Sequence, residues 1–180
     1  LQYLHRKPLG FLGELLHGGG REFVVVNVAL EPRGLAAAQV VDRGRKVVVI
    51  GGGNVADSTL SQTVDLRGAS GAVDGGNVSY NLGAWLGGYS FDPSAASVKV
   101  TFLDENKTYL GTGQIKPVTA LDRLFAISLL QRSTTGVLPV GTRYAQVDVF
   151  FDDQNPVKIG FAADYNDAFA DNLSFTIGAD

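Results

Sequence analysis

The chain has 180 residues, a length that suits one domain with a hydrophobic core of its own. Charged residues make up 18% of the sequence and the formal net charge is −3, which argues against a nucleic-acid partner. Cysteine is absent, so a disulfide framework, a thiol nucleophile and a thiolate metal site are excluded. No apolar run is long enough to span a membrane, and we expect no membrane insertion.

The first fifty residues give mixed signals. In residues 1–20 apolar side chains at helical spacing precede three consecutive glycines, so a short helix and a poorly specified strand are both open. Residues 21–30 contain a run of apolar β-branched side chains and predict a strand, as do residues 46–50. Residues 35–41 contain three consecutive alanines, which favour one or two helical turns.

From residue 57 onwards the pattern is that of short strands joined by turns. The predicted strands are residues 59–66, 78–86, 97–103, 108–113, 142–151 and 173–177. The sequence Asp-Glu-Asn-Lys at residues 104–107 is a strong hairpin signal, whereas the apolar segment 121–131 fits a strand or a short helix. Several strands without a long helix or an internal repeat predict one all-β domain over residues 1–180, an antiparallel β-sandwich or jelly roll.

The core of this sandwich can be listed from the apolar positions of the predicted strands, because alternate side chains of a strand point to opposite faces. We expect burial of Val78, Leu82, Val98, Val100, Val147, Val149, Leu173, Phe175 and Ile177.

A glycine-rich motif follows residues 46–50. Gly51, Gly53 and Ala56 have the G-x-G-x-x-A spacing that binds dinucleotides at the start of a helix. Residues 58–64 are instead rich in β-branched and hydroxyl side chains, which predict a strand. We therefore do not expect nucleotide binding.

The sequence contains few of the residue patterns that are typical of catalytic sites. His5 and His17 are the only histidines, their spacing matches no metal-binding helix pair, and no G-x-S-x-G elbow is present. The carboxylates are concentrated in turn-like sequence, which favours solvation or calcium binding over the acid–base chemistry of glycosidases. We expect a protein that is not an enzyme.

One predicted strand has a mixed aromatic and polar face. Residues 77–89 alternate between an apolar set and a set that contains Asn81, Trp85 and Tyr89, and residues 144–150 show a similar face with Tyr144 and Gln146. An aromatic ring beside amides and carboxylates suits a sugar, which stacks on the ring while polar groups bind its hydroxyls. The alternative is that Trp85 packs between two sheets, as sandwich tryptophans often do.

A cluster of aspartates near the C-terminus invites a cation. Residues 151–180 contain six aspartates and one lysine, and Asp164, Asp167 and Asp171 lie within eight residues around a turn. Calcium takes six to eight oxygen ligands, of which these carboxylates and nearby carbonyls could supply most. The alternative is a set of solvated aspartates that form turns.

Four segments, residues 58–66, 78–88, 98–110 and 165–175, resemble strands of the galactose-binding-domain-like β-sandwich family. This family includes many carbohydrate-binding modules of secreted and surface proteins, and the last segment is the most specific match. The resemblance implies a jelly-roll fold and a structural calcium where the closing strand meets the first, with Asp171 supplying a carboxylate. The family's Asn-Gly-x-Phe-Glu first strand is not recognisable in residues 1–20.

Together these observations predict a non-catalytic module, secreted or at the cell surface, that binds a glycan or polysaccharide and holds a structural calcium. The alternative is a structural or adhesive domain that contacts other proteins, because a fold of this kind does not determine its function.

Overall fold

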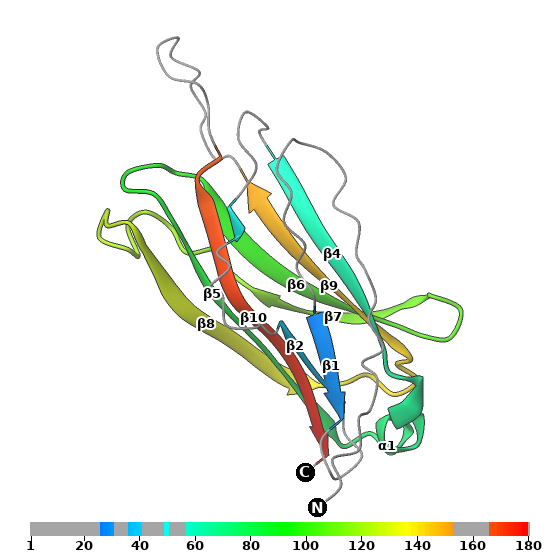
Figure 1. The fold of residues 1–180 in the computed structure, drawn as a ribbon. Coiled ribbons are helices and arrows are strands. Elements are labelled where there is room, and N and C mark those ends of the chain that lie inside the picture. The colour runs from blue at the N-terminus through cyan, green and yellow to red at the C-terminus, as the bar shows by residue number, and fades with distance from the viewer. Residues whose placement is uncertain (1–25, 31–35, 41–48, 51–56, 153–165, 180) are drawn as a thin grey trace, which may run out of the picture.

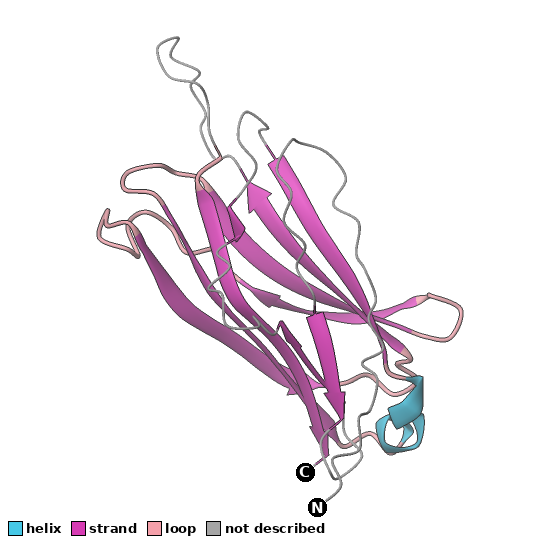
Figure 2. Cartoon of the chain, in the orientation of Figure 1, coloured by secondary structure: helices cyan, strands magenta, loops and turns pink. Residues whose placement is uncertain are grey.

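The computed structural model describes residues 26–30, 36–40, 49–50, 57–152 and 166–179, which form two antiparallel β-sheets packed against each other (Figures 1 and 2). The larger sheet has the order β1-β2-β10-β5-β8, with β3 also pairing with β10, and the smaller has the order β4-β9-β6-β7. The predicted all-β sandwich is thereby confirmed. The strands are β1 (Val26–Leu30), β2 (Ala36–Val40), β3 (Val49–Ile50), β4 (Asp57–Asp65), β5 (Val78–Gly88), β6 (Ala95–Leu103), β7 (Tyr109–Ile115), β8 (Ser128–Val137), β9 (Tyr144–Asp152) and β10 (Ala168–Ala179).

A short helical segment joins β4 of the smaller sheet to β5 of the larger one. It consists of the 3-10 turn η1 (Arg67–Ala69) and the helix α1 (Ser70–Asp74), and it lies at one end of the sandwich (Figure 1). Gly76 follows with φ of +77°, a left-handed conformation that glycine adopts without strain and that turns the chain into β5. Neither described helix has the length and apolar character needed to cross a membrane.

The helical interpretation of residues 35–41 is wrong. Ala36–Val40 is strand β2, which pairs with β1 on one side and with β10 on the other. Helix propensity is a weak preference that tertiary context overrides, and here two neighbouring strands satisfy the backbone groups of β2. The expectations for residues 1–20, and the glycine motif at residues 51–56, lie outside the described residues, but the segment after that motif is strand β4, as predicted.

The apolar segment 121–131 divides into two parts. Its first residues, up to Phe125, form turns, and strand β8 begins at Ser128 and continues to Val137. The strand interpretation is therefore correct only for the second part, and the short-helix interpretation is wrong. The first part lies in the long connection by which the chain passes from β7 in the smaller sheet to β8 in the larger one.

The core lies between the two sheets and follows the alternation predicted for β5. The side chains at Val78, Tyr80, Leu82, Ala84 and Leu86 are buried, whereas those between them are exposed or half-buried. Of the nine residues expected in the core, only Val147 is half-buried, and it still packs against the core cluster. Complete burial of one such leucine or valine contributes about 1.5–3 kcal/mol.

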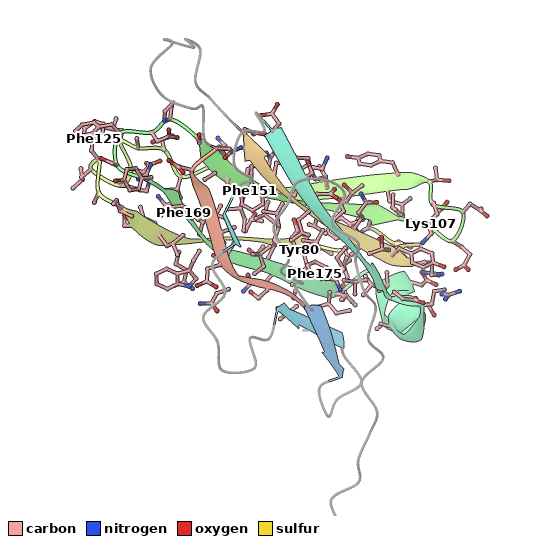
Figure 3. All side chains as sticks on the ribbon, turned by 45° about the horizontal axis from the view of Figure 1, so that its top comes forward. Tyr80, Lys107, Phe125, Phe151, Phe169 and Phe175 are labelled. Carbon is pink, nitrogen blue, oxygen red and sulfur yellow. The ribbon has the colours of Figure 1, made fainter. Side chains whose placement is uncertain are left out.

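Tyr80 occupies the centre of this core, where Figure 3 shows it beside Phe175. Its ring centroid lies 5.0 Å from that of Phe102 and 6.2 Å from that of Phe175. Gly113 of β7 and Gly136 of β8 face the two edges of the ring, and a Cβ atom at either glycine would overlap with Tyr80. The absence of a side chain at these two positions therefore makes room for the tyrosine.

Candidate functional site

Trp85 lies on the outer face of the larger sheet. It retains 38% of its surface exposed and does not belong to the core cluster, so the core alternative for this residue is not what the structure shows. Asn81 is exposed four residues earlier on the same face of β5, and Tyr89, 50% exposed, follows the last residue of that strand. The structure thus places Asn81 and Trp85 on one face of β5 and Tyr89 directly after that strand.

Side chains from three strands surround the tryptophan. The Cα partner of Trp85 on β10 is Asp171, and its partner on β8 is Gln131. Along β5 the nearest residues on the same face are Gly83 and Gly87. The Ser174 hydroxyl lies against Gly83, and the backbone of Ser128 lies against Gly87, which is buried. Across the sheet a carboxylate residue and an amide residue therefore stand on the two sides of Trp85.

Hydroxyl and amide groups continue this face away from the tryptophan. Asn81 lies between Thr135 on β8 and Thr176 on β10. At the next position towards Trp85, the hydroxyl residues Ser133 and Ser174 stand on the two sides of β5. These uncharged groups can both donate and accept hydrogen bonds.

A β-bulge in β10 adjoins the tryptophan. The pairing with β5 shifts register between Asp171 and Ser174, and Asn172 has φ of +48°. The Oδ1 atom of Asp171 accepts a hydrogen bond of 2.7 Å from the backbone N–H of Asn172. Bulges redirect neighbouring side chains and are frequent beside binding sites, and this one fixes the carboxylate next to the indole.

The other two predicted ligand-binding residues lie elsewhere. Tyr144 and Gln146 belong to β9 in the smaller sheet, and their side chains point away from the core, on the opposite side of the sandwich from the tryptophan. The ring of Tyr144 is in cation–π contact with Arg67 and Lys107, and the amide of Gln146 donates a hydrogen bond of 3.0 Å to Asp148. The five predicted residues therefore do not form one site.

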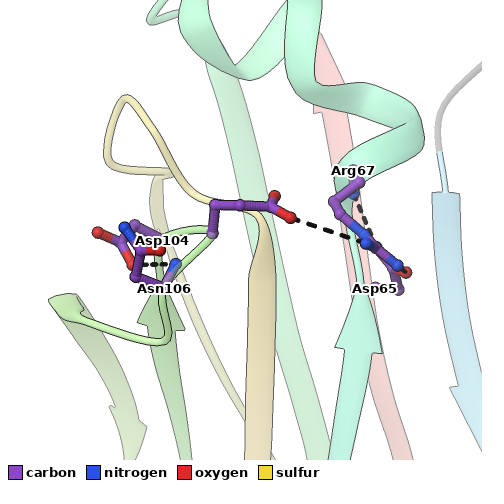
Figure 4. Close-up of polar contacts among 5 residues, drawn as sticks. Asp65, Arg67, Asp104 and Asn106 are labelled. Atoms are coloured by element: carbon purple, nitrogen blue, oxygen red, sulfur yellow. Dashed lines mark hydrogen bonds and ion pairs between the residues drawn. The ribbon is translucent and has the colours of Figure 1, made fainter.

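The charged groups around Tyr144 form a structural clamp between β4 and the β6–β7 hairpin. The guanidinium of Arg67 donates to both oxygens of Asp65 and lies 3.7 Å from Glu105 (Figure 4). The hydrogen bonds from Arg67 lower the pKa of the Asp65 carboxyl. In the hairpin turn, Asp104 accepts the backbone N–H of Asn106 (Figure 4). Exposed ion pairs of this kind contribute about 0–1 kcal/mol each, so the cluster has a local structural role.

The predicted calcium aspartates are only partly described. Asp164 lies outside the described residues, and among those that the structure describes no three His, Cys, Asp or Glu side chains are grouped to hold a metal ion. Asp167 and Asp171 are four positions apart in extended chain, which corresponds to about 13 Å between their Cα atoms. Burial and the charge of Asp92 raise the pKa of the Asp167 carboxyl. The calcium site stays a prediction, with Asp171 placed beside Trp85.

Sequence reasoning missed the contribution of β8 to the face. Gln131, Ser133 and Thr135 alternate with half-buried residues, and this period of two is visible in the sequence. What the sequence does not reveal is that β8 is the neighbour of β5, because 39 residues, including two strands of the other sheet, lie between the two strands.

The sequence matches no protein-family model and no curated protein. Solved structures with a similar fold include a family 16 carbohydrate-binding module, with 19% identity, 79% of this chain and 84% of that chain covered, and a TM-score of 0.46. They also include the Clostridium thermocellum xylanase Xyn10B CBM22-1–GH10 modules complexed with xylohexaose, with 15% identity, 80% and 25% coverage, and a TM-score of 0.43.

A viral protein has a sequence identity and a TM-score in the same range. The VP2 subviral particle of infectious bursal disease virus shows 12% identity, 92% coverage of this chain and 37% of that chain, and a TM-score of 0.48. The chain thus spans about a quarter of the xylanase chain and little more than a third of the viral chain. At these identities and TM-scores no ligand and no residue role is transferred to this chain.

Proposed function

We propose that the chain is a non-catalytic carbohydrate-binding module of a secreted or cell-surface protein, and that the β10–β5–β8 face around Trp85 holds the glycan. The observation that carries this proposal is the exposure of Trp85 on a polar sheet face. The indole is 38% exposed, so part of its ring is available to a ligand, and its polar neighbours can bind the ligand's hydroxyl groups.

The chemistry of the face suits a sugar. The apolar C–H face of a pyranose ring stacks on an indole, and its hydroxyl groups need donors and acceptors at the rim of the stack. Asp171 and Gln131 supply acceptors and donors beside Trp85, and the hydroxyl groups of the neighbouring strands extend this supply.

Replacing Trp85 with alanine is expected to abolish glycan binding, because the stacking surface is lost. We would measure the migration of the protein in native gels that contain soluble xylan, glucomannan, mixed-linkage β-glucan, galactan or starch. The wild type should be retarded by at least one polymer and Trp85→Ala by none. Since Trp85 is the only tryptophan of the sequence, its fluorescence should also change on titration with that polymer.

Tyr109→Ala provides the matched control. Tyr109 is an aromatic residue 61% exposed on β7 of the other sheet, so its replacement should leave retardation unchanged. A wild type that no polymer retards would contradict the proposal. Retardation that survives in Trp85→Ala, with the melting temperature preserved, would place the glycan on another face.

A further inference from the structure

Six large apolar side chains are exposed together at one end of the sandwich. They come from the β5–β6 loop, residues 89–94, and from the β7–β8 connection, residues 116–127, which lie side by side in Figure 1. The rings of Phe91 and Phe125 stack at 4.8 Å between centroids and join the two loops. We call this set the loop-end patch: Tyr89, Phe91, Leu121, Leu124, Phe125 and Ile127, with exposed fractions from 43% at Phe125 to 81% at Leu124.

A buried arginine holds the two loops in place. Arg123 is 3% exposed, and its guanidinium Nη1 donates hydrogen bonds to the backbone carbonyls of Gly88, Ser90 and Ala126 at 2.8, 3.3 and 2.6 Å. Its Nη2 lies 3.4 Å from the carbonyl oxygen of Asp92. These hydrogen bonds join the β5–β6 loop to the β7–β8 connection inside the protein, and they hold in place the two loops that carry the patch.

The backbone under the patch is held in an unusual conformation. Leu124 and Phe125 are consecutive non-glycine residues with φ of +51° and +61°. Their backbone N–H groups donate to the carbonyls of Leu121 and Ala120, both at 2.9 Å. Left-handed residues of this size persist only where the surroundings enforce them, and they cluster at functional sites. The backbone hydrogen bonds therefore hold Leu124 and Phe125 in the conformation that exposes their side chains.

The charges around the patch are mainly acidic. Asp92 and Asp122 belong to the two loops, and Asp167 lies near Asp92. Burial and, to a smaller extent, the charge of Asp92 raise the pKa of the Asp167 carboxyl. Hydrogen bonds from Thr119 and, to a smaller extent, the charge of Arg132 on β8 lower the pKa of Asp122. The charge of Arg123 is enclosed by carbonyl groups. Among the residues that the structure describes, these three carboxylates outnumber the accessible cations Lys116 and Arg132, which favours a ligand that carries positive charge.

A glycan and a lipid surface both fit this patch poorly. Leu121, Leu124 and Ile127 offer no ring face for a sugar, and the rings of Phe91 and Phe125 stack on each other. The Asp122 carboxylate already accepts two hydrogen bonds from Thr119. Membrane-binding surfaces combine apolar side chains with lysine and arginine, because many membranes are anionic. An acidic rim is repelled by such a surface. A rigid apolar centre with a charged rim instead has the organisation of a protein interface.

We propose that the loop-end patch docks a protein partner that presents an apolar anchor flanked by lysine or arginine. The apolar anchor packs against Phe91, Leu124 and Phe125, and the flanking cations face the carboxylates of the rim. Because Arg123 fixes the loops in advance, little conformational freedom is lost on binding. The proposed anchor contacts at Phe91, Leu124 and Phe125 lie outside the strands around Trp85, and Tyr89 is the one residue that the patch shares with the residues predicted to bind a glycan.

The test uses peptides as the probe. A random 12-residue display library is selected against the immobilised full chain, and synthetic copies of the enriched peptides are titrated against wild type, Leu124→Asp and Leu121→Asp. The expected peptides share apolar residues flanked by Lys or Arg, bind at least tenfold more weakly to both variants, and lose affinity as salt is raised. Val140→Asp is the matched control, because Val140 is 59% exposed in the β8–β9 loop and outside the patch.

Several outcomes would overturn the proposal. These are a selection that enriches no peptide, peptides without cationic residues, and peptides that bind Leu124→Asp and Leu121→Asp as tightly as wild type. Sedimentation with neutral or anionic phospholipid vesicles that is lost in Leu124→Asp would assign the patch to a lipid surface. A dimer in analytical ultracentrifugation that is lost in the same variant would assign it to a second copy of the chain. The melting temperature of each variant verifies that it is folded.

Discussion

Arg123→Met is expected to destabilise the protein by about 2–6 kcal/mol, because the substitution leaves buried carbonyl groups without their donor. The guanidinium makes hydrogen bonds of 2.8 and 2.6 Å to the carbonyls of Gly88 and Ala126, and methionine fills a similar volume without any donor. Each buried carbonyl that loses its partner costs about 1–3 kcal/mol. For a chain of this length the loss corresponds to a fall in Tm of roughly 4 °C or more.

Arg132→Met is the matched control for this prediction. Arg132 is half-buried on β8, and its guanidinium donates one hydrogen bond of 3.2 Å to the carbonyl of the adjacent Gln131. The same substitution there should change stability by about 0.5 kcal/mol or less. Denaturant unfolding followed by circular dichroism gives both values. Equal stability of the two variants would show that the carbonyl cage of Arg123 does not hold the loops.

Gly113→Ala is expected to destabilise the core by about 1–3 kcal/mol, the usual penalty for overpacking. Its Cβ would overlap with the hydroxyl of Tyr80 and lie 2.8 Å from Cζ of the ring, and the ring is confined on its other edge by Gly136. The ring cannot move away freely, since Phe102 and Phe175 pack against it. Alanine is otherwise preferred to glycine within a strand by about 0.5–1 kcal/mol, so a net loss reports the overlap itself.

Two further variants isolate the cause. Gly71→Ala adds a Cβ in helix α1 where no other atom lies within 4 Å, and it should be neutral or stabilising. In a Tyr80→Leu background the additional cost of Gly113→Ala should shrink, because the shorter side chain no longer reaches the glycine. Thermal melting of the wild type, Gly113→Ala, Tyr80→Leu and the double variant gives the coupling energy between positions 80 and 113. An unchanged cost of Gly113→Ala in the Tyr80→Leu background would contradict the overlap with the Tyr80 ring as its cause.

The alternation of side chains in β5 and β9 predicts only part of the candidate glycan face. Alternation within β5 places Asn81 and Trp85 on one face, and the structure bears this out. The same alternation places Tyr144 and Gln146 on a mixed face of β9, but that face belongs to the other sheet. A period of two tells which side chains of a strand point together, and it carries no information about which sheet the strand joins.

The loop-end patch illustrates the reverse situation. The apolar side chains of residues 121–127 suggest a core element, but the backbone forms turns there and these apolar side chains remain exposed. The feature that decides this is the guanidinium of Arg123, which draws the connection onto the β5–β6 loop. A contact between residues more than thirty positions apart leaves no periodic signal in the sequence.

By itself the sequence determined the all-β class, most strands after residue 57, the inward face of β5 and nearly all of the expected core. These properties follow from the alternation of apolar side chains and from turn residues, which act over a few positions. Only the tertiary structure decided that Asp171 and Gln131 flank Trp85, and that the helix-favouring alanines of β2 form a strand. The reason is that strand pairing is set by burial and backbone hydrogen bonding between segments far apart in the chain, and these long-range terms outweigh local propensity.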